Sequence, residues 1–218
     1  MLDISVNKLG GLALILGPAI AVISFLFRPG GGLVGGTIDP ADSVASIQGF
    51  LDNSGAATIS FLLIPIGVMI MVFGFTTLKD HLRGQAGEAW RNIGWLFALT
   101  GILGWITASA LVAGIISMDA SAVANEGVYT AQAGVNGLAT VLAGIGFTAF
   151  VLGILRSEQY NKIFTLVVLA LQLVVVVTAV IAMVDITFVQ TAAMIGGITY
   201  VGTTAWAVMI GLSLMKAE

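Results

Sequence analysis

Six long segments of this sequence have no Lys, Arg, Asp, Glu or His in their central part, and this feature constrains the fold more than any other. They lie near residues 8–28, 57–78, 92–117, 131–155, 162–184 and 191–215. A helix needs about 20 mainly apolar residues to cross the hydrocarbon core of a bilayer. Only 9% of the 218 residues are charged, against about 25% in a typical soluble domain. The sequence therefore predicts an all-α polytopic membrane protein, a single domain over residues 1–218 with six transmembrane helices.

The distribution of cations predicts how these helices are oriented. With a cytoplasmic N-terminus, only Arg28 of the eight Lys and Arg residues falls outside. The residues that fall inside are Lys8, Lys79, Arg83, Arg91, Arg156, Lys162 and Lys216. Because cytoplasmic loops collect Lys and Arg, both termini are predicted to be cytoplasmic, in a prokaryotic cytoplasmic membrane. No A-x-A-like cleavage site follows the first apolar run, so that run is predicted to be a retained helix.

The segment between the first two spans predicts a short amphipathic helix outside the membrane. In "TIDPADSVASIQGFLDNSG", Asp39 is a suitable N-cap, with Pro40 at the first helical position and Gly55 as the stop. Val44, Ile47 and Leu51 then share one face of the helix. Such a helix is expected to lie along the outer membrane surface or to cover the mouth of the bundle.

Glycines recur at a spacing of seven residues, which is two helical turns. The pairs are Gly10–Gly17, Gly67–Gly74, Gly94–Gly101, Gly137–Gly144 and Gly146–Gly153, with Gly197, Thr204 and Gly211 in the last span. Small residues on one face let membrane helices approach closely, and this spacing predicts left-handed packing near +20°. Chance is the alternative, because the chain has 28 glycines. Pro18 and Pro65 are predicted to lie within the first two spans, where proline can kink a helix.

Several kinds of chemistry lack the residues that they need. The chain has no cysteine and one histidine, which excludes disulfides, thiolate metal sites, Fe–S clusters and haem held by two histidines. No lysine inside a span is available for a retinal Schiff base. A net charge of −3 without a basic run gives no indication of nucleic-acid binding. We therefore predict no metal and no cofactor beyond a bound lipid.

Two ionisable positions leave alternatives open. His81 and Asp80 form either an acid–base pair at the cytoplasmic edge or part of a solvated loop, and the second reading is favoured. Asp185 is interpreted as a turn residue, with a cavity-facing carboxylate as the alternative.

Uncharged polar residues at similar depth in the last four spans are the candidate binding residues. Trp105, Thr140, Gln172 and Tyr200 are predicted near the bilayer midplane, with Asn136 one turn outside Thr140 and Thr203 beside Tyr200. The candidate site is lined by Trp105, Asn136, Gln172, Tyr200 and Thr203. One hypothesis is a shared site for a neutral or amphipathic ligand. The favoured alternative is hydrogen bonding between helices, at about 0.6 kcal/mol per contact. Gln172 is the most informative member, because a primary amide that faces lipid would be poorly satisfied.

The layout of the chain resembles that of small bacterial six-span membrane proteins of unknown function. The resemblance rests on an amino-terminal span, an outer segment with the acidic–proline motif "DPAD", and the short basic loop "KDHLRGQAGEAWR" after the second span. It implies an all-helical membrane fold and transfers no active-site residues.

The sequence favours a non-catalytic accessory or scaffold subunit that packs against partner helices, lipids or pigments. Its partners would be membrane lipids and other membrane chains or further copies of itself. The alternative is a channel or facilitator for a small neutral or amphipathic solute. An intramembrane enzyme that uses His81 and Asp80 ranks last, because a general acid–base pair needs a held geometry and a glycine-flanked loop gives little evidence of one.

Overall fold

Helices account for every regular element that the computed structural model describes in residues 4–30, 38–118 and 121–217. In chain order they are α1 (Val6–Phe27), α2 (Ser43–Asp52), α3 (Ser54–His81), α4 (Glu88–Ser117), η1 (Val123–Asn125), α5 (Glu126–Ser157), α6 (Lys162–Val184), η2 (Ile186–Phe188) and α7 (Val189–Met215). Six are long and apolar enough to cross a membrane. The all-α fold with six apolar helices is therefore confirmed, and it indicates a membrane location. Asp119 and the glycine-rich run 31–37 lie outside the described residues.

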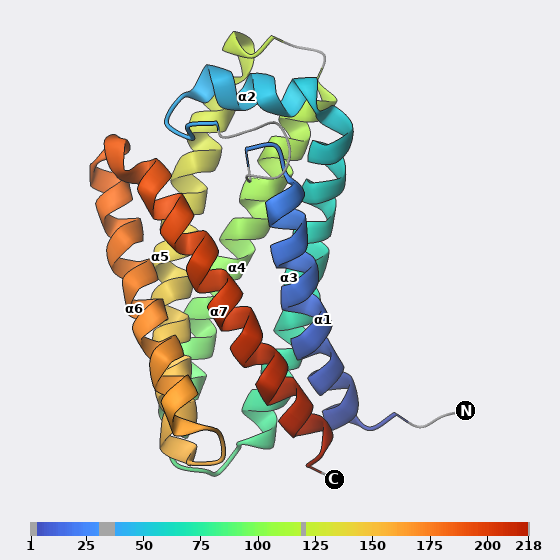
Figure 1. Ribbon diagram of the computed structural model, residues 1–218, viewed down its shortest axis with the longest axis vertical. Coiled ribbons are helices and arrows are strands. Elements are labelled where there is room, and N and C mark those ends of the chain that lie inside the picture. Colours follow the sequence, from blue (N-terminus) through green and yellow to red (C-terminus); the bar gives the residue numbers. More distant parts are fainter. Residues whose placement is uncertain (1–3, 31–37, 119–120, 218) are drawn as a thin grey trace.

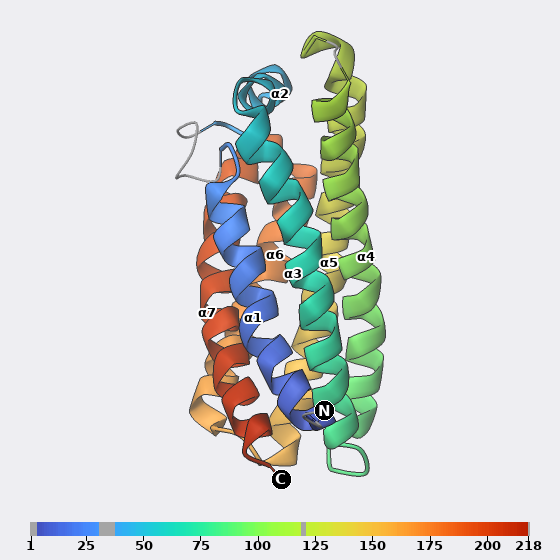
Figure 2. The ribbon, with the colours of Figure 1, turned by 90° about the vertical axis from the view of Figure 1, so that its right-hand side faces the viewer.

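The six long helices form a closed ring. Contacts join α1 to α3, α3 to α4, α4 to α5, α5 to α6, α6 to α7, and α7 back to α1. Figure 1 shows α7 crossing the bundle obliquely, from α6 at one end to α1 at the other. Helix α2 lies across one end of the ring, as the side view in Figure 2 also shows.

The start of α1 and the end of α7 lie at the end of the ring opposite α2 (Figure 1). The starts of α1, α4 and α6 meet the ends of α3, α5 and α7 there. We call it the cation-rich end, because seven of the eight Lys and Arg residues lie in these helix ends and the adjoining loops. Arg28 follows α1 at the other end. Which end faces the cytoplasm stays a prediction.

The short helix α2 exists, but its predicted limits were wrong. Asp42 is the N-cap, and its carboxylate accepts a hydrogen bond from the Ala45 N–H at 2.9 Å. Asp39 instead accepts from the Ala41 N–H in a turn that precedes the helix. The Tyr129 hydroxyl of α5 donates to the Pro40 carbonyl at 3.2 Å, and this contact holds Pro40 in the turn.

The predicted stop and the predicted apolar face of α2 also need correction. Gly55 is the second residue of α3, because only Asn53 separates the two helices. Of the predicted face, Ile47 is buried and Leu51 is partly buried against the same cluster, whereas Val44 is exposed and Phe50 is buried in addition. Phe50 packs edge-to-face on Phe61 of α3, with 5.4 Å between ring centroids. Tertiary packing on the ring thus selects the buried face of α2.

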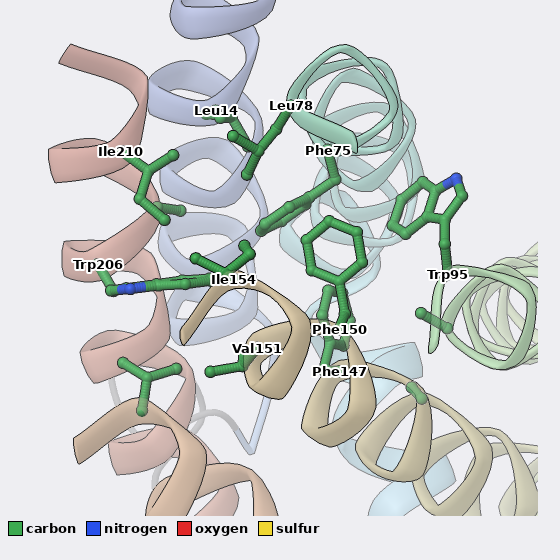
Figure 3. Packing of buried hydrophobic residues seen from close by; sticks show 14 of the residues in the cluster. Leu14, Phe75, Leu78, Trp95, Phe147, Phe150, Val151, Ile154, Trp206 and Ile210 are labelled. Carbon is green, nitrogen blue, oxygen red and sulfur yellow. The ribbon is translucent and has the colours of Figure 1, made fainter. Parts of the chain in front are cut away.

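An aromatic cluster fills the interior of the ring toward the cation-rich end (Figure 3). Phe75 of α3 lies at its centre and is 1% exposed. Its ring centroid lies 6.0 Å from that of Trp95 in α4 and 6.2 Å from that of Trp206 in α7. The rings of Phe147 and Phe150 in α5 meet it at 5.5 and 5.6 Å. Four of the six ring helices therefore meet through one set of aromatic side chains.

Glycines bring helix backbones together where any Cβ would collide. A Cβ on Gly17 of α1 would lie 2.7 Å from the Gly67 carbonyl oxygen of α3, and a Cβ on Gly67 would lie 2.7 Å from that of Gly17. The same reciprocal contact joins Gly94 of α4 and Gly146 of α5, at 2.6 and 2.7 Å. By contrast, a Cβ on Gly197 would meet nothing within 4 Å. The crossing angle near +20° stays a prediction.

Candidate functional site

Three of the predicted midplane positions lie close together on α4, α5 and α7. The Trp105 indole N–H donates to the Thr140 hydroxyl at 3.1 Å. Thr140 in turn donates to the Asn136 carbonyl one turn away, at 2.8 Å. The Trp105 and Tyr200 rings meet edge-to-face, with 5.8 Å between centroids. Asn136 contributes its backbone here, while its side chain is exposed.

The other two predicted residues form a hydrogen bond between α6 and α7. The Gln172 amide donates to the Thr203 hydroxyl at 2.8 Å, and Thr203 donates to the Thr199 carbonyl at 2.8 Å. A second bond between these helices, which the sequence did not indicate, runs from the Trp206 indole to the Thr165 hydroxyl at 3.3 Å. The Gln172–Thr203 and Trp206–Thr165 bonds both link α6 to α7.

Chemically, this midplane cluster offers hydroxyl, amide and indole groups and no ionisable acid or base near neutral pH. Tyr200 and Thr203 lie three residues apart on α7, so they project from adjacent positions of one helix face. The amide of Gln172, which is 3% exposed, is used in contact with α7. The arrangement supports helix association, and its use as a ligand site stays a hypothesis.

Replacing Gln172 with Leu is expected to lower the free energy of unfolding by about 0.6–1.7 kcal/mol, which are the average and the largest values measured for hydrogen bonds between membrane helices. Thr203→Val should cost a similar amount, and the double variant should cost less than the sum because both changes remove one bond. Unfolding of all four proteins in mixed micelles would measure this coupling. Strictly additive effects would contradict a direct energetic role for the 2.8 Å contact.

His81 is the last residue of α3 and lines a cleft of about 360 Å³. Asp80 forms ion pairs with Lys79 at 3.4 Å and Arg83 at 3.0 Å. No hydrogen bond joins His81 to Asp80 within the described residues, and no group of His, Asp and Glu there could hold a metal ion. The ion-pair partners of Asp80 are therefore Lys79 and Arg83. We call this cavity the His81 cleft; its lining residues are Val6, Asn7, Phe73, Thr76, Thr77, Asp80 and His81.

An apolar groove of about 670 Å³ follows the seam between α1 and α3. We call it the α1–α3 groove. Pro65 lies in its wall, and α3 continues through this residue as a helix. Its lining residues are Leu9, Leu12, Ala13, Leu16, Pro65, Ile66, Met69, Ile70 and Phe73.

Arg91 has a structural role that the sequence did not reveal. It lies in the first turn of α4 and is 0% exposed. Its Nη1 donates to the carbonyl oxygens of Ala86 and Gly153, both at 2.8 Å. Its Nη2 donates to those of Leu82 at 2.6 Å and Gln85 at 3.2 Å. One guanidinium group thus ties the α3–α4 loop to α5.

Neighbouring residues complete this attachment of the loop. Gly87 has a left-handed φ of 83°, and a Cβ there would collide with the Gly153 carbonyl. The Glu88 carboxylate accepts from the Gly84 N–H at 2.9 Å. Burial raises the pKa of the Tyr160 hydroxyl to about 12, although the positive charge of Arg91 opposes the shift. This phenol is therefore neutral at physiological pH.

Asp185 lies in the turn between α6 and η2, as the sequence predicted. Its carboxylate accepts hydrogen bonds from the Thr187 hydroxyl and backbone N–H, at 2.6 and 3.0 Å. These bonds lower its pKa below the ordinary value. The side chain is therefore a charged turn group at neutral pH.

Comparison with known proteins assigns this chain neither to a family nor to a function. No family model matches the chain, and neither a curated protein nor a solved structure matches it. The function has to be argued from the chain's own residues.

Proposed function

We propose that this chain is a non-catalytic integral membrane protein that serves as an accessory or scaffold subunit for partner helices. The observation that carries the proposal is a stripe of small residues on α5 that no helix of the ring covers. Gly127, Ala131 and Gly134 are exposed, and a Cβ at either glycine would meet nothing within 4 Å. We call these three residues the α5 small-residue stripe.

The spacing of the stripe suits a helix partner. Steps of four and three residues keep all three side chains on one helix face. Small residues allow another backbone to approach closely, and dispersion contacts then drive association where lipid removes the hydrophobic effect between helices. Inside the ring, Gly94 and Gly146 meet their neighbours in this way. The partner would be another membrane chain or a second copy of this one.

The filled interior favours this contact function over the channel or facilitator. Phe75 and the aromatic side chains around it occupy the middle of the ring toward the cation-rich end. A solute path through the ring would require these side chains to move apart. Vesicles that contain the protein are expected to pass neutral solutes no faster than empty vesicles do. A flux well above that of empty vesicles would favour the facilitator.

Replacing Gly134 with Leu is expected to separate the chain from its partner without unfolding it. Because nothing lies within 4 Å of a Cβ at this position, the added side chain fits the isolated ring and obstructs only an approaching helix. Gly55→Leu is the matched control, at an exposed glycine in the first turn of α3.

Cross-linking in native membranes, followed by mass measurement in mild detergent, would test this. The original protein and Gly55→Leu should migrate above one 22.4 kDa chain, and Gly134→Leu should migrate as one chain with unchanged thermal unfolding. An original protein that is a single chain in the membrane, or a complex that survives Gly134→Leu, would refute the proposal.

A further inference from the structure

The two cavities between α1 and α3 are adjacent. Phe73 lies in the wall of both the α1–α3 groove and the His81 cleft. Their volumes, about 670 and 360 Å³, fall within the range of ligand pockets, about 300–1,000 Å³. From Pro65 to Phe73 the groove follows α3 for about 12 Å, and the cleft continues to His81 for about another 12 Å, at 1.5 Å per residue.

The chemistry of the wall changes along this path. All nine groove residues are apolar. The cleft adds the amide of Asn7, the hydroxyls of Thr76 and Thr77, and the imidazole of His81. Within the described residues, neither the Asn7 amide nor the His81 ring takes part in a hydrogen bond, so both can donate to a ligand. A ligand that matches both parts has an apolar chain and a polar head.

The charges at the cleft favour an anionic head. Asp80 is its one acidic lining residue, and Lys79 and Arg83 both pair with that carboxylate. Lys79 and Arg83 do not line the cleft, but they offset the negative charge of Asp80 in its wall. The segment 79–83 therefore has a net positive charge beside the cleft, which would attract a phosphate at the membrane boundary.

A second helix fits the α1–α3 groove poorly. The small residues of the two helices contact each other inside the seam, as Gly17 and Gly67 do. The groove wall consists instead of long side chains such as Leu12, Ile66 and Met69, which keep another backbone at a distance. A flexible acyl chain can follow such a surface.

We propose that the seam between α1 and α3 is a binding site for one anionic glycerophospholipid. An acyl chain lies in the α1–α3 groove, and the phosphate accepts hydrogen bonds from Asn7 and His81 in the His81 cleft. The site rests on the membrane location in the proposed function and does not depend on a partner at the α5 small-residue stripe.

Native mass spectrometry of the delipidated, full-length protein, titrated with phosphatidylglycerol in micelles, tests this site. Asn7→Ala combined with His81→Ala removes the head contacts, and Ile66→Trp fills the groove at a residue that is 51% exposed. Each is expected to weaken binding about tenfold or more, as expected for the loss of hydrogen bonds to a charged group or of the chain site. Val177→Trp, at a position on α6 that is 57% exposed, is the matched control and should bind as the original protein does. Added salt should weaken the head contact.

The outcomes separate this proposal from its alternatives. Equal binding by all variants would show unspecific lipid association and overturn it. Displacement of the lipid by millimolar inorganic phosphate would indicate a free-phosphate site and would also overturn it. Loss of the cross-linked complex in Ile66→Trp, with lipid binding intact, would identify the groove as a partner interface. Gly134→Leu should leave lipid binding unchanged, so failure of the proposed function and failure of the lipid site are distinguishable.

Discussion

Replacing Arg91 with Met is expected to lower the free energy of unfolding by at least about 3 kcal/mol, because hydrogen bonds from charged groups contribute about 1.5–3 kcal/mol each. The side chain makes four such bonds to backbone carbonyls. Methionine fills much of the space but donates nothing, so the buried carbonyls of Leu82 and Gly153 lose a donor. Arg91→Lys keeps the charge, yet a single ammonium group cannot reach four carbonyls in the planar geometry of a guanidinium.

Arg156→Gln is the control for this result. It removes the same charge from the same end of the ring, at a residue that is exposed. This substitution is expected to change the free energy of unfolding by no more than about 0.5 kcal/mol, as most surface substitutions do. Equilibrium unfolding in mixed micelles of increasing SDS content would measure all four proteins. If Arg91→Met unfolded at the same SDS fraction as Arg156→Gln, Arg91 would be an orientation signal without a structural role.

Replacing Gly94 with Ala is expected to destabilise the ring by about 1–3 kcal/mol or more, the usual cost of overpacking. The new Cβ would lie 2.6 Å from the Gly146 carbonyl oxygen. Because the obstacle is backbone, relief requires α4 and α5 to separate along their shared length. Gly114→Ala makes the same chemical change in the same helix, where nothing lies within 4 Å. It should be neutral or stabilising by up to about 1 kcal/mol, since alanine favours a helix over glycine.

Unfolding midpoints of the two glycine variants in the same micelles would compare them directly. A Gly94→Ala protein as stable as Gly114→Ala would mean that α4 and α5 can separate at little cost. That result would remove close backbone packing as a stabilising feature of this pair.

Local sequence patterns gave a wrong prediction where two residues were equally suited to one structural role, as at the N-cap of α2. Asp39 and Asp42 are both good N-caps, and a proline after the first favours Asp39. The bond from Tyr129 to Pro40 decides for Asp42, and it joins residues 89 positions apart. Arg91 shows a similar limit. In the sequence, Arg91 and Arg83 are both cations of the same loop. Arg91 is the buried, structural one because it lies within hydrogen-bond distance of Gly153 in α5, whereas Arg83 is a solvated charge.

The candidate site was predictable in part, because the sequence gives the depth of a residue in its span but not the direction in which its side chain points. Depth within each span follows from counting residues, so Trp105, Gln172, Tyr200 and Thr203 were selected together. The rotation of each helix about its axis cannot be obtained by counting residues. In the structure this rotation brings the Gln172 amide to the Thr203 hydroxyl and leaves the Asn136 side chain exposed. The groove and the cleft between α1 and α3 were not anticipated, because a cavity belongs to two helices at once.

The sequence by itself determined the number, length and apolar character of the helices, since hydrocarbon accepts only backbones that satisfy their own hydrogen bonds. It also grouped the cations that meet at one end of the ring. Tertiary structure alone decided the neighbours of each helix, the burial of Arg91 and the glycines that contact one another. These depend on how side chains from distant segments fit together, and an apolar face in lipid has no hydrophobic preference for one neighbour over another.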